Sequence, residues 1–129
     1  MDNKKLTFID IETTGRDIVR HEIIEIGCLV VEEVQPGNFE VKKELEIKVQ
    51  PEHIDTAEPE ALRINGYDPS QWMFAHTLQQ AMEQLADATR DAVMVAHNVG
   101  FDYSFLAKAF SDTDIENPMF YANLDTLSI

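Results

Sequence analysis

Residues 8–15 of the chain, FIDIETTG, are its most informative stretch, because they place two acids inside an apolar run that ends at a glycine. A run of this kind is typical of a buried strand. Asp10 and Glu12 stand two residues apart, so their side chains point to one face of that strand, about 7 Å apart along it. Buried charges are normally paired or bound to a metal ion. Since the segment contains no Lys or Arg, it predicts a divalent cation as the partner of the two carboxylates.

The other interpretation of residues 8–15 is a pair of solvated acids on an edge strand. Acids are depleted in strands, and buried ones need partners, so we favour the metal site. The interpretation gains weight from a second stretch much further along the chain.

That second stretch, residues 93–106 (VMVAHNVGFDYSFL), predicts a strand followed by a helix. Its apolar run ends near Ala96, and helical spacing of apolar residues begins after Gly100. Asp102 falls in the first turn of this helix, where the helix dipole stabilises an anion. A third carboxylate beside the two acids of the first strand would complete an oxygen site suited to magnesium or manganese.

With these stretches the chain resembles the DnaQ-like, DEDD-type 3′–5′ exonucleases, which include proofreading epsilon subunits and have a ribonuclease H-like fold. Residues 8–15 resemble the first motif of that family, and residues 97–106 resemble the second. Between them, Pro51 and residues 60–67 (EALRINGY) resemble the middle segment, a short helix and loop that packs on the terminal nucleotide. Residues 124–127 (LDTL) resemble the segment that opens the next helix. The second motif fits the histidine branch of the family better than the tyrosine branch.

The resemblance implies hydrolysis of the 3′-terminal phosphodiester, with release of nucleoside monophosphates, by a mechanism that uses two Mg²⁺ or Mn²⁺ ions. Asp10, Glu12 and Asp102 would be the catalytic and metal-binding residues, and Asp10 would bridge both ions. Residues that would contact the terminal nucleotide or orient the loop beside it are Thr13, Thr14, Ile64, Asn65, His97, Asn98 and Phe101. For His97, a histidine satisfied at a strand end is an equally open interpretation. The substrate would be a single-stranded or frayed 3′ end, with DNA favoured, and the partner a polymerase or replication complex.

The family's third motif carries the fourth carboxylate and the general base, as H-x4-D or Y-x3-D. His97 and Asp102 match the first spacing but belong to the second motif. Tyr121 and Asp125 match the other spacing, but they follow a strand-like approach, and we expect Asp125 to cap a helix. We therefore expect that the chain contains no general base before Ile129. We also expect that the domain lacks its C-terminal helices and that the chain alone is inactive. The alternative is a catalytically dead module that binds a partner or a nucleic-acid 3′ end.

Composition sets further limits on the chain. Its 129 residues suit a single domain, 1–129, and its 44% hydrophobic content suits a globular core. Ten basic against 24 acidic side chains give a formal net charge of −14, which argues against a broad nucleic-acid-binding surface. The one cysteine excludes an intrachain disulfide, and we find neither a signal peptide nor an apolar stretch that would span a membrane. The cytoplasm is therefore the expected location.

The remaining pattern predicts an α/β fold with a mixed sheet of about five strands, the first three antiparallel, and flanking helices. Thr77 and Gln80 have the spacing of a capping box, which predicts a helix that begins after Thr77. The other expected elements are strands at 21–31 and 39–49 joined by a turn at 36–38, a short helix near 59–64, a polar loop at 112–118 and a strand-like segment at 119–121.

Overall fold

The computed structural model describes residues 4–95 and 99–121 of the chain. Its elements in chain order are β1 (Lys5–Thr13), β2 (Ile23–Gln35), β3 (Asn38–Lys48), the short 3-10 helix η1 (Ile54–Thr56), α1 (Pro59–Ile64), α2 (Leu78–Ala88), β4 (Val93–Val95), α3 (Val99–Thr113) and β5 (Phe120–Tyr121). The predicted alternation of strands and helices is confirmed. The helix α3 runs on to Thr113, so the polar loop expected from residue 112 begins two residues later.

Within these residues the strands form one mixed sheet in the order β3-β2-β1-β4-β5. The first three strands pair antiparallel, and the two-residue turn between β2 and β3 places Gly37 at a φ of 77°, which glycine adopts without strain. β4 pairs parallel with β1, and β5 pairs parallel with β4. The expected mixed sheet with an antiparallel start is therefore confirmed, and β1 lies at its centre.

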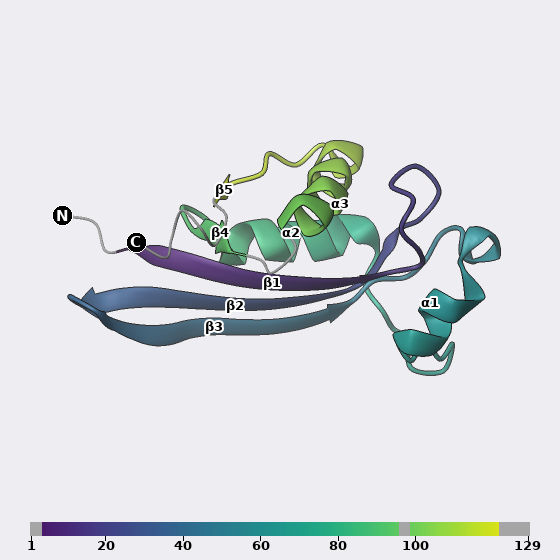
Figure 1. The fold of residues 1–129 in the computed structure, drawn as a ribbon, viewed down its shortest axis with the longest axis horizontal. Helices are drawn as coiled ribbons and strands as arrows, with labels where there is room; N and C mark the ends of the chain where they lie inside the picture. The colour runs from purple at the N-terminus through teal and green to yellow at the C-terminus, as the bar shows by residue number, and fades with distance from the viewer. Residues whose placement is uncertain (1–3, 96–98, 122–129) are drawn as a thin grey trace.

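The helices α2 and α3 cover one face of the sheet, as Figure 1 shows. Alternation along β1 turns Ile9 and Ile11 toward these helices, whose own contributions to the core include Leu85 and Leu106. The predicted capping box is present: Thr77 Oγ1 accepts from the Gln80 N–H at 3.1 Å, and Gln80 Oε1 accepts from the Thr77 N–H at 3.1 Å. This cap fixes the start of α2 and thus the way its apolar face meets the sheet.

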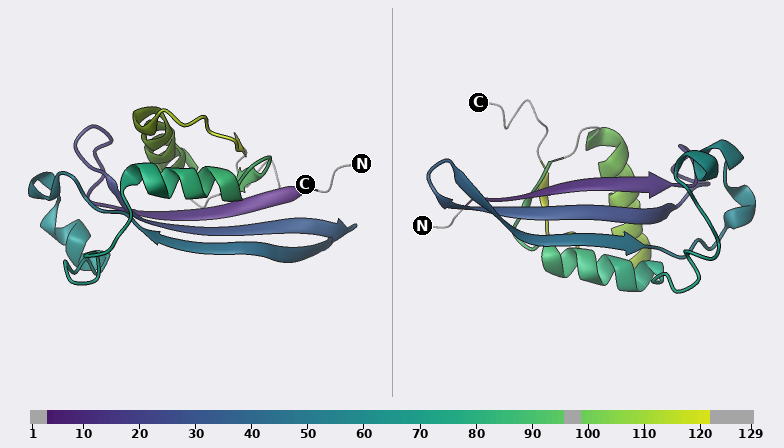
Figure 2. Two further views of the ribbon diagram at one scale, coloured as in Figure 1. Left: turned by 180° about the vertical axis from the view of Figure 1, so that it is seen from behind. Right: turned by 90° about the horizontal axis from the view of Figure 1, so that it is seen from below.

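The opposite face of β1, β2 and β3 carries no helix among the described residues, as the two views of Figure 2 show. Phe8 is 41% exposed on this side. A hollow of about 480 Å³ lies over it, and Asp10, Gly27 and Leu45 are among the lining residues. The sheet therefore has one packed face and one open face, and Asp10 belongs to the open one.

The loop between α1 and α2 is anchored by a buried aromatic side chain. Trp72 is buried, and its Nε1–H donates to the carbonyl of Ile24 at 2.9 Å. Lys48 Nζ lies 4.5 Å from the centroid of the Trp72 ring.

No helix in residues 4–95 or 99–121 has both the length and the apolar character needed to cross a membrane.

Candidate active site

The strand β1 delivers two of the expected acids. Asp10 is exposed and Glu12 is half-buried, and they alternate with the buried Ile9 and Ile11. Because alternate residues of a strand share a face, both carboxylates lie on the side of β1 that faces away from the core. Asp10 stands at the centre of the sheet, paired with Gly27 of β2, whose missing side chain leaves the space above it open.

The helix α3 delivers the third acid. Asp102 lies in the first turn of α3 and is only 7% exposed. Its pKa is raised to about 6, first by burial and then by the negative charges of Asp10 and Glu12. The pKa of Glu12 is also raised, by burial and then by the charges of Asp10 and Glu25. The three carboxylates therefore lie close enough to repel one another.

This donor set fits a hard divalent cation, because it supplies oxygen ligands only and its members repel one another without a positive charge between them. As the side chains are placed in residues 4–95 and 99–121, no group of three His, Cys, Asp or Glu could hold a metal ion. The three carboxylates are thus close enough to repel one another, but farther apart than ligands that share one metal ion. A bound cation would have to draw the carboxylates together, and their assignment as metal ligands stays a prediction.

A hollow of about 420 Å³ adjoins Glu12 at the end of β1. Four of the residues expected to contact the terminal nucleotide line it, namely Thr13, Ile64, Asn65 and Phe101. Ile64 is 68% exposed, so its apolar side chain is free to pack on a ligand. Phe101 packs against Phe105, with ring centroids 4.9 Å apart. The hollow therefore joins apolar surface to the acidic end of β1.

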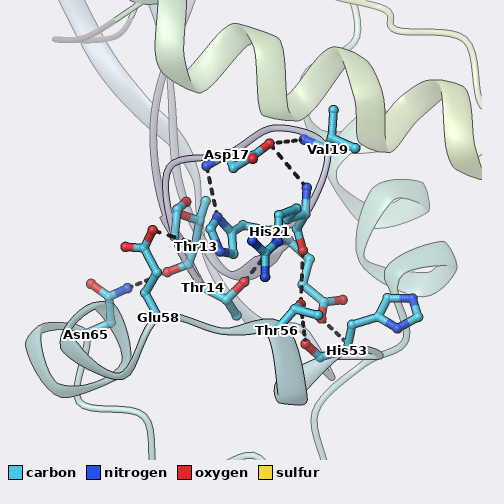
Figure 3. Close-up of polar contacts among 12 residues, drawn as sticks. Thr13, Thr14, Asp17, Val19, His21, His53, Thr56, Glu58 and Asn65 are labelled. Atoms are coloured by element: carbon cyan, nitrogen blue, oxygen red, sulfur yellow. Dashed lines mark hydrogen bonds and ion pairs between the residues drawn. The ribbon is translucent and has the colours of Figure 1, made fainter.

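The end of α1 is tied to the end of β1 by a hydrogen bond across this hollow's wall. Asn65 Nδ2–H donates to the carbonyl of Thr13 at 2.8 Å, and Thr13 Oγ1–H donates to the carbonyl of Gly15 at 2.6 Å. Figure 3 shows both threonines of the motif beside Asn65. The expected middle segment is thus held next to the first motif through the backbone of Thr13.

Thr14 is placed differently from Thr13. It is fully buried, its N–H donates to the carbonyl of Glu22 at 2.9 Å, and its Oγ1 accepts from the Glu22 N–H at 3.0 Å. Thr14 is not among the residues that line the hollow. Its hydroxyl closes the loop between β1 and β2, and its contact with a nucleotide stays a prediction.

His21 organises this loop, and no motif in the sequence pointed to it. The ring is buried, and its Nδ1 accepts from the Asp17 N–H at 2.9 Å. A Cβ on Gly15 would lie 2.3 Å from the same Nδ1, so the ring packs directly on the glycine of the first motif. Asp17 in turn accepts from the Val19 N–H at 2.9 Å, which is the main reason that the pKa of Asp17 lies below its usual value. Figure 3 shows this arrangement.

The loop also contacts the segment that leads into α1. The Glu58 N–H donates to the carbonyl of Thr14 at 2.8 Å, and the Glu22 carboxylate accepts from the His53 N–H at 2.7 Å. His21 Nε2 lies 4.0 Å from Glu58 Oε1. These contacts hold α1, and with it one wall of the hollow, against the end of β1.

Three residues singled out in the sequence, His97, Asn98 and Asp125, lie outside the described residues. Tyr121 ends β5, and only its backbone is described. The orientation of the loop before α3 and the role of the Y-x3-D spacing therefore stay predictions.

Comparison with known proteins places this chain in a family. The exonuclease family model RNase_T matches residues 7–128. Ribonuclease T of Baumannia cicadellinicola subsp. Homalodisca coagulata is 31% identical over 94% of this chain and 61% of its own length. Ribonuclease T of Shewanella oneidensis is 29% identical over 94% of this chain and 60% of its own length. The chain spans about three fifths of the length of these curated relatives.

Solved structures of exonuclease I share the fold. A product-bound exonuclease I superposes with a TM-score of 0.78 at 14% identity, over 98% of this chain and 31% of that one. Escherichia coli exonuclease I in complex with a dA16 oligonucleotide gives a TM-score of 0.78 at 14% identity, over 97% of this chain and 29% of that one. Together with the matches in sequence, the expected ribonuclease H-like exonuclease fold is confirmed.

The chain therefore belongs to the RNase_T family of exonucleases, within the DEDD superfamily. Enzymes of this family depend on divalent metal ions. The family resemblance found in the sequence is confirmed, and the roles of the individual residues stay predictions.

Proposed function

We propose that this chain contains the metal-binding and nucleotide-binding parts of a 3′–5′ exonuclease that trims single-stranded nucleic acid. The observation that carries the proposal is the mutual repulsion of Asp10, Glu12 and Asp102 beside a hollow whose lining includes exposed apolar surface at Ile64. Carboxylates gathered in this way need a cation, and the hollow next to them has room for a terminal nucleotide.

Asp10, Glu12 and Asp102 would hold Mg²⁺ or Mn²⁺ ions. Two such ions at a phosphodiester activate the attacking water and stabilise the leaving oxygen. The fold would hold these carboxylates in position. Two lie on the open face of the central strand β1, and the third, Asp102 at the start of α3, is only 7% exposed. Burial keeps competing water away from Asp102, which strengthens its interaction with a cation.

The terminal nucleotide would occupy the hollow of about 420 Å³. Ile64 and Phe101 would pack on its base or sugar, a contact that tolerates any base and is worth about 1–3 kcal/mol. The backbone around Thr13, fixed by Asn65, would position the sugar. His97, Asn98 and Thr14 would complete the surroundings of the nucleotide.

The acidic character of the chain supports binding to only a few nucleotides of the substrate. With a net charge of −14, the chain has little attraction for a long stretch of nucleic acid, so affinity would come from the ions and the terminal nucleotide. A single-stranded or frayed 3′ end fits this requirement better than a duplex. The relatives named Ribonuclease T and the exonuclease I complex with dA16 make RNA and DNA strands the two substrates to compare. Association with a polymerase or replication complex stays a prediction.

The test uses the complete gene product and two oligonucleotides of equal sequence, one RNA and one DNA, each labelled at its 5′ end. With Mg²⁺ or Mn²⁺, we expect labelled strands that shorten step by step and nucleoside monophosphates as products. Asp10→Asn should abolish this trimming. Asp112→Asn, which changes an exposed acid paired with Lys108 on the same helix as Asp102, should retain it.

Two results would contradict the proposal. Immediate release of the labelled mononucleotide would show attack from the 5′ end. Binding of 3′ ends without any trimming, with all three acids intact, would favour a catalytically dead binding module instead.

A further inference from the structure

We propose that the guanidinium group of Arg16 binds a backbone phosphate of the substrate strand, at the penultimate linkage, which is the neighbour of the scissile one. The proposal rests on the exonuclease function proposed above. Arg16 directly follows the first motif and lines the same hollow as Glu12 and Phe101. It is the one basic side chain among the described residues that line this hollow.

The surroundings of Arg16 are acidic. The other charged residues of the lining are Glu12, Glu58 and Glu60. A nucleic-acid strand that enters this hollow brings negative phosphates toward these carboxylates, and the repulsion must be offset. Metal ions at the three acids would offset it at the scissile phosphate only. The neighbouring phosphates need a separate cation, and Arg16 is placed to supply it.

The guanidinium of Arg16 is also free to bind a ligand. Within the described part of the chain it makes no hydrogen bond or ion pair, whereas Arg63 of α1 donates from two nitrogens to the Glu60 carboxylate. Arg90 is likewise paired, with its Nη2 3.9 Å from Asp87 Oδ1. A guanidinium presents a planar fork of donors that matches phosphate oxygens, so an unpaired one beside a substrate hollow is suited to this contact.

The backbone of Arg16 is held in place from both sides. Gly15 packs directly on the ring of His21, and the Asp17 N–H donates to His21 Nδ1 at 2.9 Å. Both neighbours of Arg16 are thus fixed by one buried side chain, which makes His21 a positioning residue. A fixed backbone lowers the entropy that the arginine loses when it binds a phosphate.

The experiment measures binding of the complete gene product to a fluorescent single-stranded DNA by anisotropy, as a function of salt concentration, with Ca²⁺ in place of Mg²⁺ or Mn²⁺ so that the strands are not trimmed. The DNA carries a methylphosphonate, a neutral linkage that resists cleavage, at its last linkage, its penultimate linkage, or far from the 3′ end. The variants are Arg16→Gln, Arg16→Lys and, as the matched control, Arg90→Gln.

We expect Arg16→Gln to weaken binding about tenfold on the strand with the distant methylphosphonate. The slope of log K against log salt concentration should fall in magnitude by about 0.7, the value for one lost phosphate contact on a single strand. Arg16→Lys should keep most of the slope, and Arg90→Gln should leave both quantities unchanged. When the contacted linkage is the neutral methylphosphonate, Arg16→Gln should not weaken binding further, because the ion pair between the guanidinium and the phosphate is already absent.

An unchanged salt slope in Arg16→Gln, or an undiminished loss on the strand whose penultimate linkage is a methylphosphonate, would overturn the phosphate contact while leaving the exonuclease proposal intact. If the unaltered protein neither binds nor trims 3′ ends, the exonuclease function fails and the role of Arg16 fails with it. A melting temperature of Arg16→Gln close to that of the unaltered protein shows that the variant is folded, and a large drop would replace the binding role by a structural one.

Discussion

Replacing Asp102 with Asn is expected to stabilise the metal-free protein at neutral pH and to change its stability little near pH 4. The pKa of Asp102 is raised from 3.8 to about 6, first by burial and then by the charges of Asp10 and Glu12. Above pH 6 the folded protein therefore carries a buried carboxylate that repels two others. Asn has nearly the same shape and no charge, so the repulsion and the desolvation of an ion both disappear.

The sign and size of the effect follow from the two pKa values. Below pH 3.8 the carboxyl is protonated in both states, and its charge costs nothing. Between pH 3.8 and about 6 the unfolded chain releases the proton while the folded protein keeps it, so stability falls as pH rises. Above pH 6 the loss of unfolding free energy is complete. A difference of one pKa unit between the two states corresponds to 1.36 kcal/mol, so the loss reaches about 3 kcal/mol. A buried Asn amide that lacks partners costs part of this gain, so we expect a net stabilisation of about 1–3 kcal/mol.

The assay is urea unfolding of the complete gene product in EDTA at intervals from pH 4 to pH 8. The difference in unfolding free energy between Asp102→Asn and the unaltered protein should grow across pH 4–6 and then level off. Asp10→Asn should show a smaller change of the same sign, because it removes one of the charges that repel Asp102. Asp112→Asn, on the exposed side of α3, should show no such growth. A constant loss of stability in Asp102→Asn at every pH would show that the carboxylate has a structural partner in the folded protein and is not destabilised by its charge.

Further expectations concern the metal, the first motif and the cap of α2. Mn²⁺ should raise the melting temperature of the unaltered protein but not of Asp10→Ala, since a ligand of the folded state stabilises it; equal shifts would reject Asp10 as a ligand. Gly15→Ala should lower the free energy of unfolding by about 1–3 kcal/mol, because its Cβ would lie 2.3 Å from His21 Nδ1. Gly27→Ala, whose Cβ would lie 3.6 Å from the Asp10 carbonyl, should cost less, and equal losses in urea unfolding would argue against the clash. Thr77→Ala should cost about 1 kcal/mol by removing the cap of α2, whereas Thr77→Ser should retain it; a loss as large in the serine variant would exclude the hydroxyl as the cause.

The elements predicted from the sequence are those whose signal is local. The apolar run of residues 8–15, the turn at 36–38 and the capping box of Thr77 each need only a few neighbouring residues. The nearness of Asp102 to Asp10 and Glu12 was expected from the order of strand and helix, which brings the start of α3 to the end of β4 beside β1.

The contacts that the sequence could not reveal join residues far apart in the chain. Asn65 meets Thr13 across 52 positions, and Trp72 meets Ile24 across 48. The role of His21 depends on a loop closed by Thr14 and Glu22, and neither residue type signals such a role by itself. Likewise, the resemblance implies nucleotide contacts for both threonines of the motif without distinguishing their places: Thr13 lines the hollow, and Thr14 is buried beneath the loop, where its contact with a nucleotide stays a prediction.

Anomalous diffraction from crystals of the complete gene product grown with Mn²⁺ and a nucleoside monophosphate would locate the metal ions relative to the three carboxylates. We predict manganese peaks bound by the carboxylates of Asp10, Glu12 and Asp102, two of them about 3.5–4 Å apart, with the nucleotide in the adjoining hollow. Manganese bound elsewhere, with these three carboxylates still apart from any ion, would contradict the account.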